Sequence, residues 1–434
     1  MKLRKTLAVS AALVMGAAGL TACSGSSSNG GSTGASGGTV NMTFWGNSTT
    51  GAGKAYWEKT VADFEKANPN VKITIQELQN EDFDGKLQTA LNSTSAPDIF
   101  MQRGGGKMAA MVDAGQLMDI TSSITDATKK VITAGSFKSQ TIDGKIYAMP
   151  NAGGPGGIFY SKDLFAKAGI TTTPKTMDEL NADVTKLKAA GIDPIALGAK
   201  DAWPAAQWYY WFALRECSQT TMSTAAKDKT FTDSCWLKAG QDLQTFADTK
   251  PFNHGFLTTS AQQGAGSSAG LVANHKAAME LMGDWDPGVI ASLTPDQKPL
   301  SDLGWFPFPT TSGGQGDGAA IMGAVGGMSC SANAPKPACT DFLNYIATTP
   351  VQEGYYKAFD APPVNTEAQA VMTEPYLKEM MASYNAAPYV SQWLDTEYGQ
   401  NVGNALNVGV VNLLAGTGDA AGIIKAANDA AAKG

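Results

Sequence analysis

The feature of this sequence that most constrains its fold is an alternation of two hydrophobic periodicities in its first mature third. Segments in which apolar and polar residues alternate, typical of strands, are followed by segments with apolar residues at helical spacing. The strand patterns are Val40–Trp45, Val71–Ile75 and Pro97–Met101, and the helical patterns are Trp57–Phe64 and Phe83–Leu91. This β-α-β-α-β order predicts a parallel sheet with helices on its faces.

The same alternation resumes in the second mature third. The expected elements are a strand at Ile158–Tyr160, a short helix at Asp163–Ala168, a longer helix from Thr176, a strand at Ile195–Leu197 and a sheet segment at Gly323–Met328. Thr176-x-x-Glu179 is a capping box, in which the two side chains satisfy the first free amides of a helix. The sequence therefore predicts two α/β lobes, with helices up to the C-terminus.

The N-terminus has the pattern of an export signal. Three basic residues precede an uncharged apolar run, Leu7–Leu20, which is shorter than the roughly 20 residues that span a bilayer. The run ends in Leu20-Thr21-Ala22-Cys23, which resembles the lipobox of bacterial lipoproteins. We expect residues 1–22 to be a lipoprotein signal peptide and Cys23 to be lipidated; the alternative is an ordinary signal peptide with a chance Cys. Residues 23–38, rich in Gly and Ser, predict a flexible tether.

Charge and cysteine content narrow the classes of function. Removing the three basic residues of the leader leaves 29 Lys and Arg against 39 Asp and Glu, so the net charge changes from −7 to −10. This balance does not favour a nucleic-acid ligand. Beyond Cys23 an even number of cysteines remains, and proximity in sequence predicts the disulfides Cys217–Cys235 and Cys330–Cys339. With only His254 and His275 as imidazoles and no Cys-x-x-Cys, we expect no metal and no cofactor, in a monomer.

A set of short motifs carries a family resemblance over nearly the whole mature chain. The motifs are Phe44-Trp45-Gly46, Asn68-Pro69 to Ile73, Ala96-Pro97-Asp98-Ile99, Gly144 to Pro150, Phe159 to Phe165, Pro174 to Leu180, Gly283-Asp284-Trp285 and Phe306 to Pro309. In this order they resemble the maltose-binding-protein-like, carbohydrate-specific extracellular solute-binding proteins of ABC importers, of the lipoprotein type. The stretch Asn401–Ala415 is similar to binders of xylo-oligosaccharides.

The resemblance implies a two-lobed periplasmic-binding-protein-like fold, each lobe a mainly parallel sheet flanked by helices, with a hinge between the lobes. The expected N-terminal lobe is residues 39–152 and about 303–348, and the C-terminal lobe is residues 153–302 and about 349–434. A small sugar, an oligosaccharide, would bind in the cleft and be delivered to permease subunits in the membrane, with a cytoplasmic ATPase as a further partner. The protein would lie outside the cytoplasm, anchored to the cell membrane.

The candidate sugar-binding residues of the first lobe follow its predicted strands, because a bound molecule lies beyond the carboxyl ends of parallel strands. They are Asn47 after the first strand, Glu81 and Asp82 after the second, and Gln102 and Arg103 after the third. Three glycines, 104–106, would let the backbone approach a ligand. Asn151 precedes a glycine run at 153–157, which is either a flexible loop facing the ligand or a plain surface loop. The alternative for the set is ordinary loops, with Asp82 as a helix cap.

Candidates in the second lobe are mainly aromatic, because rings cover the apolar faces of sugars. Six aromatic residues lie between Trp203 and Phe212, too many to face one core at helical spacing. Trp203 is free to stack on a sugar; Trp208 is a second candidate, although its spacing to Trp211 favours a core position. Trp285 is the expected stacking residue and Asp286 a hydroxyl partner, the alternative being a hinge-packing Trp and a turn Asp. Asp360 and Trp393 are further candidates for the cleft wall.

Enzyme functions have weaker support. Gly-x-Ser-x-Gly occurs at 34–38, inside the tether, and at 266–270, where no apolar strand precedes Ser268. A secreted esterase would need His254 or His275 as its base, and no spacing singles out the carboxylate pair of a glycoside hydrolase. A sugar sensor with the same binding lobes stays open as an alternative. The sequence therefore predicts a binding protein and not an enzyme.

Overall fold

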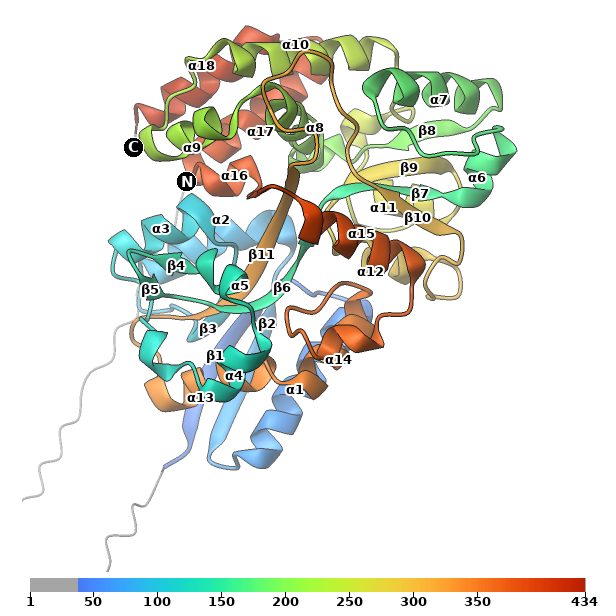
Figure 1. The fold of residues 1–434 in the computed structure, drawn as a ribbon. Coiled ribbons are helices and arrows are strands. Elements are labelled where there is room, and N and C mark those ends of the chain that lie inside the picture. Colours follow the sequence, from blue (N-terminus) through green and yellow to red (C-terminus); the bar gives the residue numbers. More distant parts are fainter. Residues whose placement is uncertain (1–37, 434) are drawn as a thin grey trace, which may run out of the picture. The chain divides into compact units, whose positions relative to one another are not determined.

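The computed structural model describes residues 38–433, and from Thr39 onward the chain forms one compact unit (Figure 1). The predicted signal peptide, the predicted lipidation site Cys23 and the predicted tether up to residue 37 lie outside the described residues. Within the described part of the chain, no helix has the length and apolar character needed to cross a bilayer.

The first sheet has six strands in the order β12-β11-β3-β1-β2, with β6 beside β11. Its strands are β1 (Val40–Gly46), β2 (Val71–Glu77), β3 (Ile99–Gln102), β6 (Met149–Pro155), β11 (Ile321–Cys330) and β12 (Val390–Ser391). β1 runs parallel to β2 and to β3, and Phe44 pairs with Ile75 on one side and Ile99 on the other. The parallel β-α-β-α-β unit predicted from the sequence is therefore confirmed.

The second sheet has four strands in the order β10-β7-β9-β8. They are β7 (Gly157–Ser161), β8 (Asp193–Ala196), β9 (Ala277–Met282) and β10 (Leu303–Phe306), while β4 (Thr141–Ile142) and β5 (Lys145–Ile146) form a separate hairpin. β8 is parallel to β9, whereas β7 is antiparallel to both β9 and β10. β11 is likewise antiparallel to β3 and β6 in the first sheet. Three of the five strand pairs of the first sheet are parallel, as predicted, whereas in the second sheet only β8 and β9 are. The antiparallel pairs arise because strands that arrive from the other lobe enter in the opposite direction.

The chain crosses between the lobes through strands. Gly156 alone separates β6 of the first sheet from β7 of the second. β11 crosses within its own length, since Ile321 and Met322 lie in the second core and Val325 and Met328 in the first. The glycine run 153–157 is therefore part of two strands, and neither loop interpretation was correct.

The first elements of two predicted segments, residues 303–348 and 349–434, lie in the opposite lobe from the one predicted. β10 begins residues 303–348 but pairs with β7 of the second sheet, so the return crossing falls after residue 306. α14 (Thr349–Phe359) begins the last segment, yet its Val351 and Tyr355 pack in the first core. The exact lobe boundaries otherwise stay a prediction.

Helices cover both sheets. Around the first sheet lie α1 (Gly51–Ala67), α2 (Asn80–Leu91), α3 (Gly105–Asp113), α4 (Asp126–Val131), α5 (Ala134–Lys138), α13 (Lys336–Ile346) and α14. The second lobe holds α6 (Lys162–Lys167), α7 (Met177–Ala189), α8 (Trp203–Glu216), α9 (Gln219–Asp228), α10 (Ser234–Asp248), α11 (Ser268–Ala273), α12 (Asp286–Leu293), α15 (Pro375–Ala386), α16 (Leu394–Glu397), α17 (Gln400–Leu414) and α18 (Ala420–Ala431). Single 3₁₀ turns lie at 121–123, 199–201, 256–258 and 368–371. This is the two-lobed α/β architecture that the sequence predicts.

Local signals in the sequence correspond to observed structure. Thr176 Oγ1 accepts the Glu179 amide at 3.2 Å and the Glu179 carboxylate accepts the Thr176 amide at 3.3 Å, so the capping box is formed. The structure also joins both predicted cysteine pairs, with Cα–Cα distances of 5.1 Å for Cys217–Cys235 and 6.2 Å for Cys330–Cys339. The first disulfide links α8 to α10, and the second links β11 to α13.

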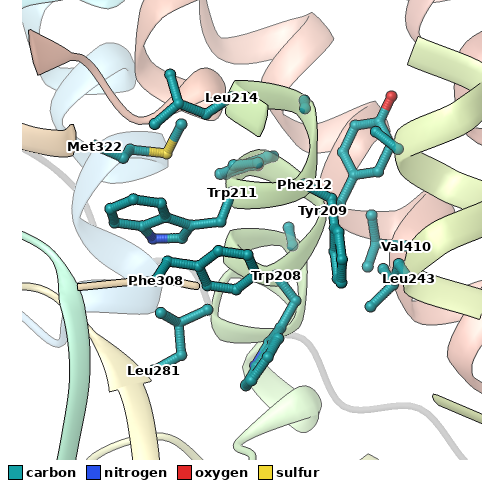
Figure 2. Close-up of a cluster of buried hydrophobic side chains, with 14 of the residues drawn as sticks. Trp208, Tyr209, Trp211, Phe212, Leu214, Leu243, Leu281, Phe308, Met322 and Val410 are labelled. Atoms are coloured by element: carbon teal, nitrogen blue, oxygen red, sulfur yellow. The ribbon is translucent and has the colours of Figure 1, made fainter. Parts of the chain in front are cut away.

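Helix α8 is buried on every side (Figure 2). All five aromatic residues from Trp208 to Phe212 are at most 1% exposed and share one core, whereas the sixth, Trp203, is half-buried and packs elsewhere. Five can share the core because α8 is packed between α10, α17 and the strands β9 and β11. A helix enclosed by neighbours on all faces is apolar all round.

Candidate functional site

Three tryptophans from distant parts of the second lobe converge. Trp203 begins α8, Trp285 immediately precedes α12, and Trp393 immediately precedes α16. The ring centroids of Trp203 and Trp285 are 6.3 Å apart, and those of Trp285 and Trp393 are 6.0 Å apart. Trp203 and Trp285 are half-buried, whereas Trp393 is 7% exposed. We call this group the indole run; it contains three of the twelve predicted ligand residues.

Helix starts and a glycine position these rings. Pro204 stands in the first turn of α8 and Pro287 in the first turn of α12, where a missing amide proton carries no cost. A Cβ on Gly156 would clash with the ring of Trp393, so the crossing from β6 to β7 passes directly against this indole. The glycine run therefore allows the third tryptophan to pack on the strands that join the lobes.

Polar groups beside the indole run lack hydrogen-bond partners. Within the described residues, Nε1 of Trp203 and Trp393 finds no acceptor, and the carboxyl oxygens of Asp286 and Glu280 find no partner beyond each other and Ser268. Each such buried group costs about 1–3 kcal/mol when left unpaired. Core indoles such as Trp208 share this lack of an acceptor, so the unpaired carboxyls are the more informative feature. All of these atoms are buried, so they could donate to or accept from a ligand hydroxyl only where the packing around them opens.

Burial raises the pKa of the carboxyls in this region. The pKa of Asp286 is raised to about 8 and that of Asp284 to about 7, in both cases by burial. Burial, followed by the neighbouring Asp286, raises the pKa of Glu280 well above its usual range. Glu280 lies in β9, and the sequence analysis did not identify it. Its only signal is a single carboxyl in the otherwise apolar strand Ala277–Met282.

In the first lobe, Asn47 and Arg103 belong to one hydrogen-bond network. Asn47 Nδ2 donates to Asn80 Oδ1 at 3.3 Å, and Arg103 Nη2 donates to the same oxygen at 3.0 Å. Arg103 Nε also donates to Asp84 Oδ1 at 2.6 Å, and Lys107 Nζ donates to Asp84 Oδ2 at 2.7 Å. Burial raises the pKa of Asp84, but the two cations outweigh it and lower the pKa to about 2. The network holds Arg103 in a fixed position with its charge neutralised.

Gln102 organises its own loop. Its Oε1 accepts the amides of Arg103 at 2.9 Å and Gly104 at 3.2 Å, and its Nε2 donates to Ser329 Oγ at 3.3 Å. The following glycines do not open the backbone to a ligand as predicted. Added Cβ atoms on Gly105 and Gly106 would meet the backbone of residues 396–399, because α3 packs against α16 there.

Glu81 and Asp82 are both exposed at the start of α2. Asp82 pairs with Lys86 at 2.9 Å and does not cap the helix, whose N-cap is Gln79. Glu81 Oε2 accepts a long 3.4 Å bond from Gln263 Nε2, which also donates to Gln79 Oε1 at 3.1 Å. Gln263 precedes α11 of the second lobe, so this contact joins the two lobes; the sequence offered no signal for it.

Asn151 and Asp360 lie near the crossing segments, and both already have partners. Asn151 is 5% exposed and its Oδ1 accepts from Gln352 Nε2 at 3.3 Å. Asp360 accepts the phenol proton of Tyr376, and burial raises the pKa of Asp360 to about 6. Both side chains hold the crossing region together, and neither is among the unpaired groups.

Trp208 belongs to the core of the second lobe. Its ring stacks on Phe246 with centroids 5.1 Å apart. It also meets Phe308 edge-on, with centroids 5.7 Å apart (Figure 2). The side chain is fully buried among these rings. Trp208 is therefore a core residue, as its spacing to Trp211 also indicated, and not a residue that stacks on a sugar.

The residues of the esterase alternative do not assemble. Ser268 Oγ donates to the carbonyl of Ala261 at 3.0 Å, and His275 Nε2 contacts Asp302 Oδ1 at 3.0 Å. Asp163, His275 and Asp302 bring potential metal-ligand atoms within 4.8 Å of one another. Asp302 also accepts the Asp163 amide and the Ser161 hydroxyl, so it orders the start of α6 without an ion.

Comparison with known proteins agrees with this architecture. The sequence profile of bacterial extracellular solute-binding proteins matches residues 46–353. The multiple sugar-binding protein of Streptococcus mutans is 26% identical over 317 residues, 70% of this chain and 71% of that protein. The diacetylchitobiose binding protein DasA of Streptomyces coelicolor is 25% identical over 339 residues, 76% of this chain and 74% of that protein.

Among solved structures, one from work on xylan utilization by Caldanaerobius polysaccharolyticus matches with a TM-score of 0.82. It is 26% identical and covers 91% of this chain and 100% of that one.

Proposed function

The chain belongs to the family of bacterial extracellular solute-binding proteins, and from this premise we propose that it binds a small neutral sugar between its lobes and delivers it to an ABC importer. The observation that carries the proposal is the indole run with unpaired donors and acceptors beside it. Indole faces cover the apolar C–H surface of a sugar, and hydroxyl groups both donate and accept. An importer requires no bond to be made or broken by the binding protein.

The proposed site draws on both lobes. Trp203, Trp285 and Asp286 belong to the second lobe, and Asn47 and Arg103 to the first. A ligand shifts the balance of open and closed states only by its differential affinity for them, so contact with both lobes is needed for closure. Residues 153–157 and 320–325 would form the hinge, since the chain crosses there.

We further propose an oligosaccharide, with xylo-oligosaccharides as the first candidates. The similarity to a structure from work on xylan utilization supports this choice. The proposed partners are permease subunits in the membrane, and Cys23 with its lipid would hold the protein beside them. Replacing Cys23 with Ser should release the protein from membranes; retention of an unlipidated chain would contradict the anchor.

Calorimetry on the chain from Ser24 tests the sugar site. We expect Trp285→Ala to weaken oligosaccharide binding at least tenfold, because a half-buried stacking ring is lost. Tyr345→Ala is the matched control, since it removes a half-buried ring that packs on Phe64 in the first lobe. Unchanged affinity in Trp285→Ala would show that the sugar binds elsewhere. Consumption of the sugar by the purified protein would refute the binding function.

A further inference from the structure

The glycines at 104–106 face the other lobe. They stand at the start of α3 in the first lobe, and α3 packs against α16 of the second lobe. A Cβ on Gly105 would lie 3.0 Å from the carbonyl oxygen of Thr396, and a Cβ on Gly106 would lie 2.5 Å from the carbonyl oxygen of Glu397. Both distances are shorter than ordinary contacts of a Cβ atom, so a larger residue at either position would push α16 away. The two lobes therefore meet here through their backbones.

Gln392 joins the same two regions by hydrogen bonds. Its Nε2 donates to the carbonyl oxygen of Arg103 at 3.1 Å, and its Oε1 accepts the amide of Trp393 at 3.0 Å. Trp393 is the third ring of the indole run, and Arg103 lies in the loop that Gln102 organises. One half-buried side chain thus connects an aromatic residue of the second lobe to a polar loop of the first. We call residues 104–106 and 392–399 together the seam.

Each side of the seam is anchored in its own lobe. Leu394 and Tyr398 of α16 are buried in the second core, whereas Met108 of α3 is buried in a first-lobe cluster with Phe100 of β3. The two helices are far apart in the sequence, so the seam is a non-covalent contact between the lobes. A rotation of the lobes about the crossing strands would separate these helices, because each helix moves with the core in which its side chains are packed.

We propose that the seam is a closing contact of the sugar site, in which Gln392 is a positioning residue and the glycines at 104–106 set how closely the lobes approach. The inference rests on the proposed function and adds residues that do not stack on the sugar. When the lobes close, Gln392 fixes the backbone of Trp393 against the loop of Arg103, so the aromatic and polar walls of the site are held at one distance. Opening breaks the bond to Arg103 and separates the two backbones.

Stopped-flow tryptophan fluorescence on the chain from Ser24 tests the seam. The probes are xylotriose, maltotriose, raffinose and diacetylchitobiose, and the variants are compared on a sugar that the parent binds. We expect Gln392→Ala to weaken binding by about three- to tenfold, because one hydrogen bond between the lobes is lost. We expect Gly106→Ala to weaken binding by about tenfold or more, because the added methyl group holds the lobes apart. In both variants the sugar should dissociate faster than from the parent.

Matched controls alter similar groups within the first lobe. Gly85→Ala adds a methyl group to α2 at a position where no group of the described residues outside its own helix lies within 4 Å. Gln116→Ala removes an amide that donates to Asn92 Oδ1 at 2.8 Å. Both controls should bind sugar as the parent does. Parental affinity and dissociation rate in Gln392→Ala and Gly106→Ala would overturn the inference alone, whereas a parent protein that binds no oligosaccharide would overturn the proposed function and the inference with it.

Hydrogen exchange separates a closing contact from a purely structural one. In the parent, bound sugar should slow the exchange of the backbone amides of residues 105–107 and 396–399 by about tenfold or more, since closure covers them. Gly106→Ala should show little of this slowing, while its unfolding temperature without sugar stays near that of Gly85→Ala. Equal exchange in the parent with and without sugar would show that the seam is permanently closed and would overturn the inference.

Discussion

One buried carboxyl site in each lobe treats charge in the opposite way. In the first lobe Asp84 lies between Arg103 and Lys107, and these cations bring its pKa down to about 2 in spite of burial. In the second lobe Glu280 and Asp286 meet with no cation at salt-bridge distance among the described residues, and burial raises the pKa of Asp286 to about 8. The first site thus keeps its carboxylate charged between two cations, while the second keeps its carboxyls protonated and in contact with each other.

A buried cation of the second lobe follows the same rule. Arg215 is 2% exposed, and its guanidinium donates to the carbonyl oxygens of Phe308 and Ala320 at 2.8 Å and of Pro309 at 3.2 Å. Among the described residues it has no carboxylate at salt-bridge distance, and burial lowers its pKa to about 10. The difference teaches that a buried guanidinium can be satisfied by the neutral dipoles of carbonyl groups, as Arg215 is, or by a carboxylate, as Arg103 is.

Removing the buried cation should give the largest effect. We expect Arg215→Met to lower the free energy of unfolding by about 3–5 kcal/mol, because three buried carbonyl oxygens lose their donor at about 1–3 kcal/mol each. Urea denaturation measures this loss. Lys238→Met, which breaks an exposed helical pair with Asp242, is the control and should cost less than about 0.5 kcal/mol. Similar losses in both variants would show that the buried hydrogen bonds of Arg215 stabilise the fold no more than an exposed ion pair does.

Breaking the ion cluster of Asp84, Arg103 and Lys107 should lower the free energy of unfolding somewhat less than Arg215→Met does. Asp84→Asn leaves Arg103 and Lys107 together without a counter-charge, and we expect a loss of about 2–3 kcal/mol because these side chains are partly exposed. Since the folded pKa is depressed, the stabilisation is present above pH 4 and is lost as the pH falls towards 2. Asp82→Asn, at an exposed pair with Lys86, should change stability little at any pH. If the stability of the parent protein and of Asp84→Asn changed equally as the pH falls from 4 to 2, Asp84 would not be stabilised by Arg103 and Lys107.

The carboxyl pair of Glu280 and Asp286 should respond to pH in the opposite direction from Asp84. A carboxyl with a raised folded pKa binds its proton more tightly in the folded state, so stability falls as the pH rises from about 4 to about 8. Each such group contributes a slope of about 1.4 kcal/mol per pH unit. Asp286→Asn should remove one such slope, measured by thermal unfolding from pH 5 to pH 8. Asp302→Asn in the same lobe should not, because the pKa of Asp302 is lowered. Identical slopes in the two variants would contradict the assignment of this slope to Asp286.

The contact between the lobes should give the smallest effect. Gln263→Ala removes the donor to Gln79 and Glu81, and we expect closure to weaken by about 0.5–1 kcal/mol. Sugar affinity should then fall by about two- to fivefold, and small-angle scattering should show a larger open fraction. Gln262→Ala is the neighbouring control. An affinity equal to that of the parent would show that the lobes close without this contact.

The candidate site was only partly readable from the sequence. Trp203, Trp285 and Trp393 stood out as aromatics at turns, but nothing in their spacing indicated that they meet. Gln102 was identified as a ligand residue by its place after a strand and Asn151 by its place before the glycine run. Gln102 is engaged by Ser329 and Asn151 by Gln352. Glu280 was missed because a strand pattern reports which residues are apolar and does not show what faces a lone carboxyl.

What the sequence by itself determined is local. The β-α-β-α-β unit, the capping box at Thr176 and the pairing of Cys217 with Cys235 and of Cys330 with Cys339 depend on residues close together in the chain. The tertiary structure decided the strand directions at the crossings, the burial of α8 on every side and the meeting of the indole run with the carboxyl pair. Periodicity specifies which face of an element is apolar, whereas the partner of that face, and the charge of a group enclosed there, are set only when distant elements pack and exclude water.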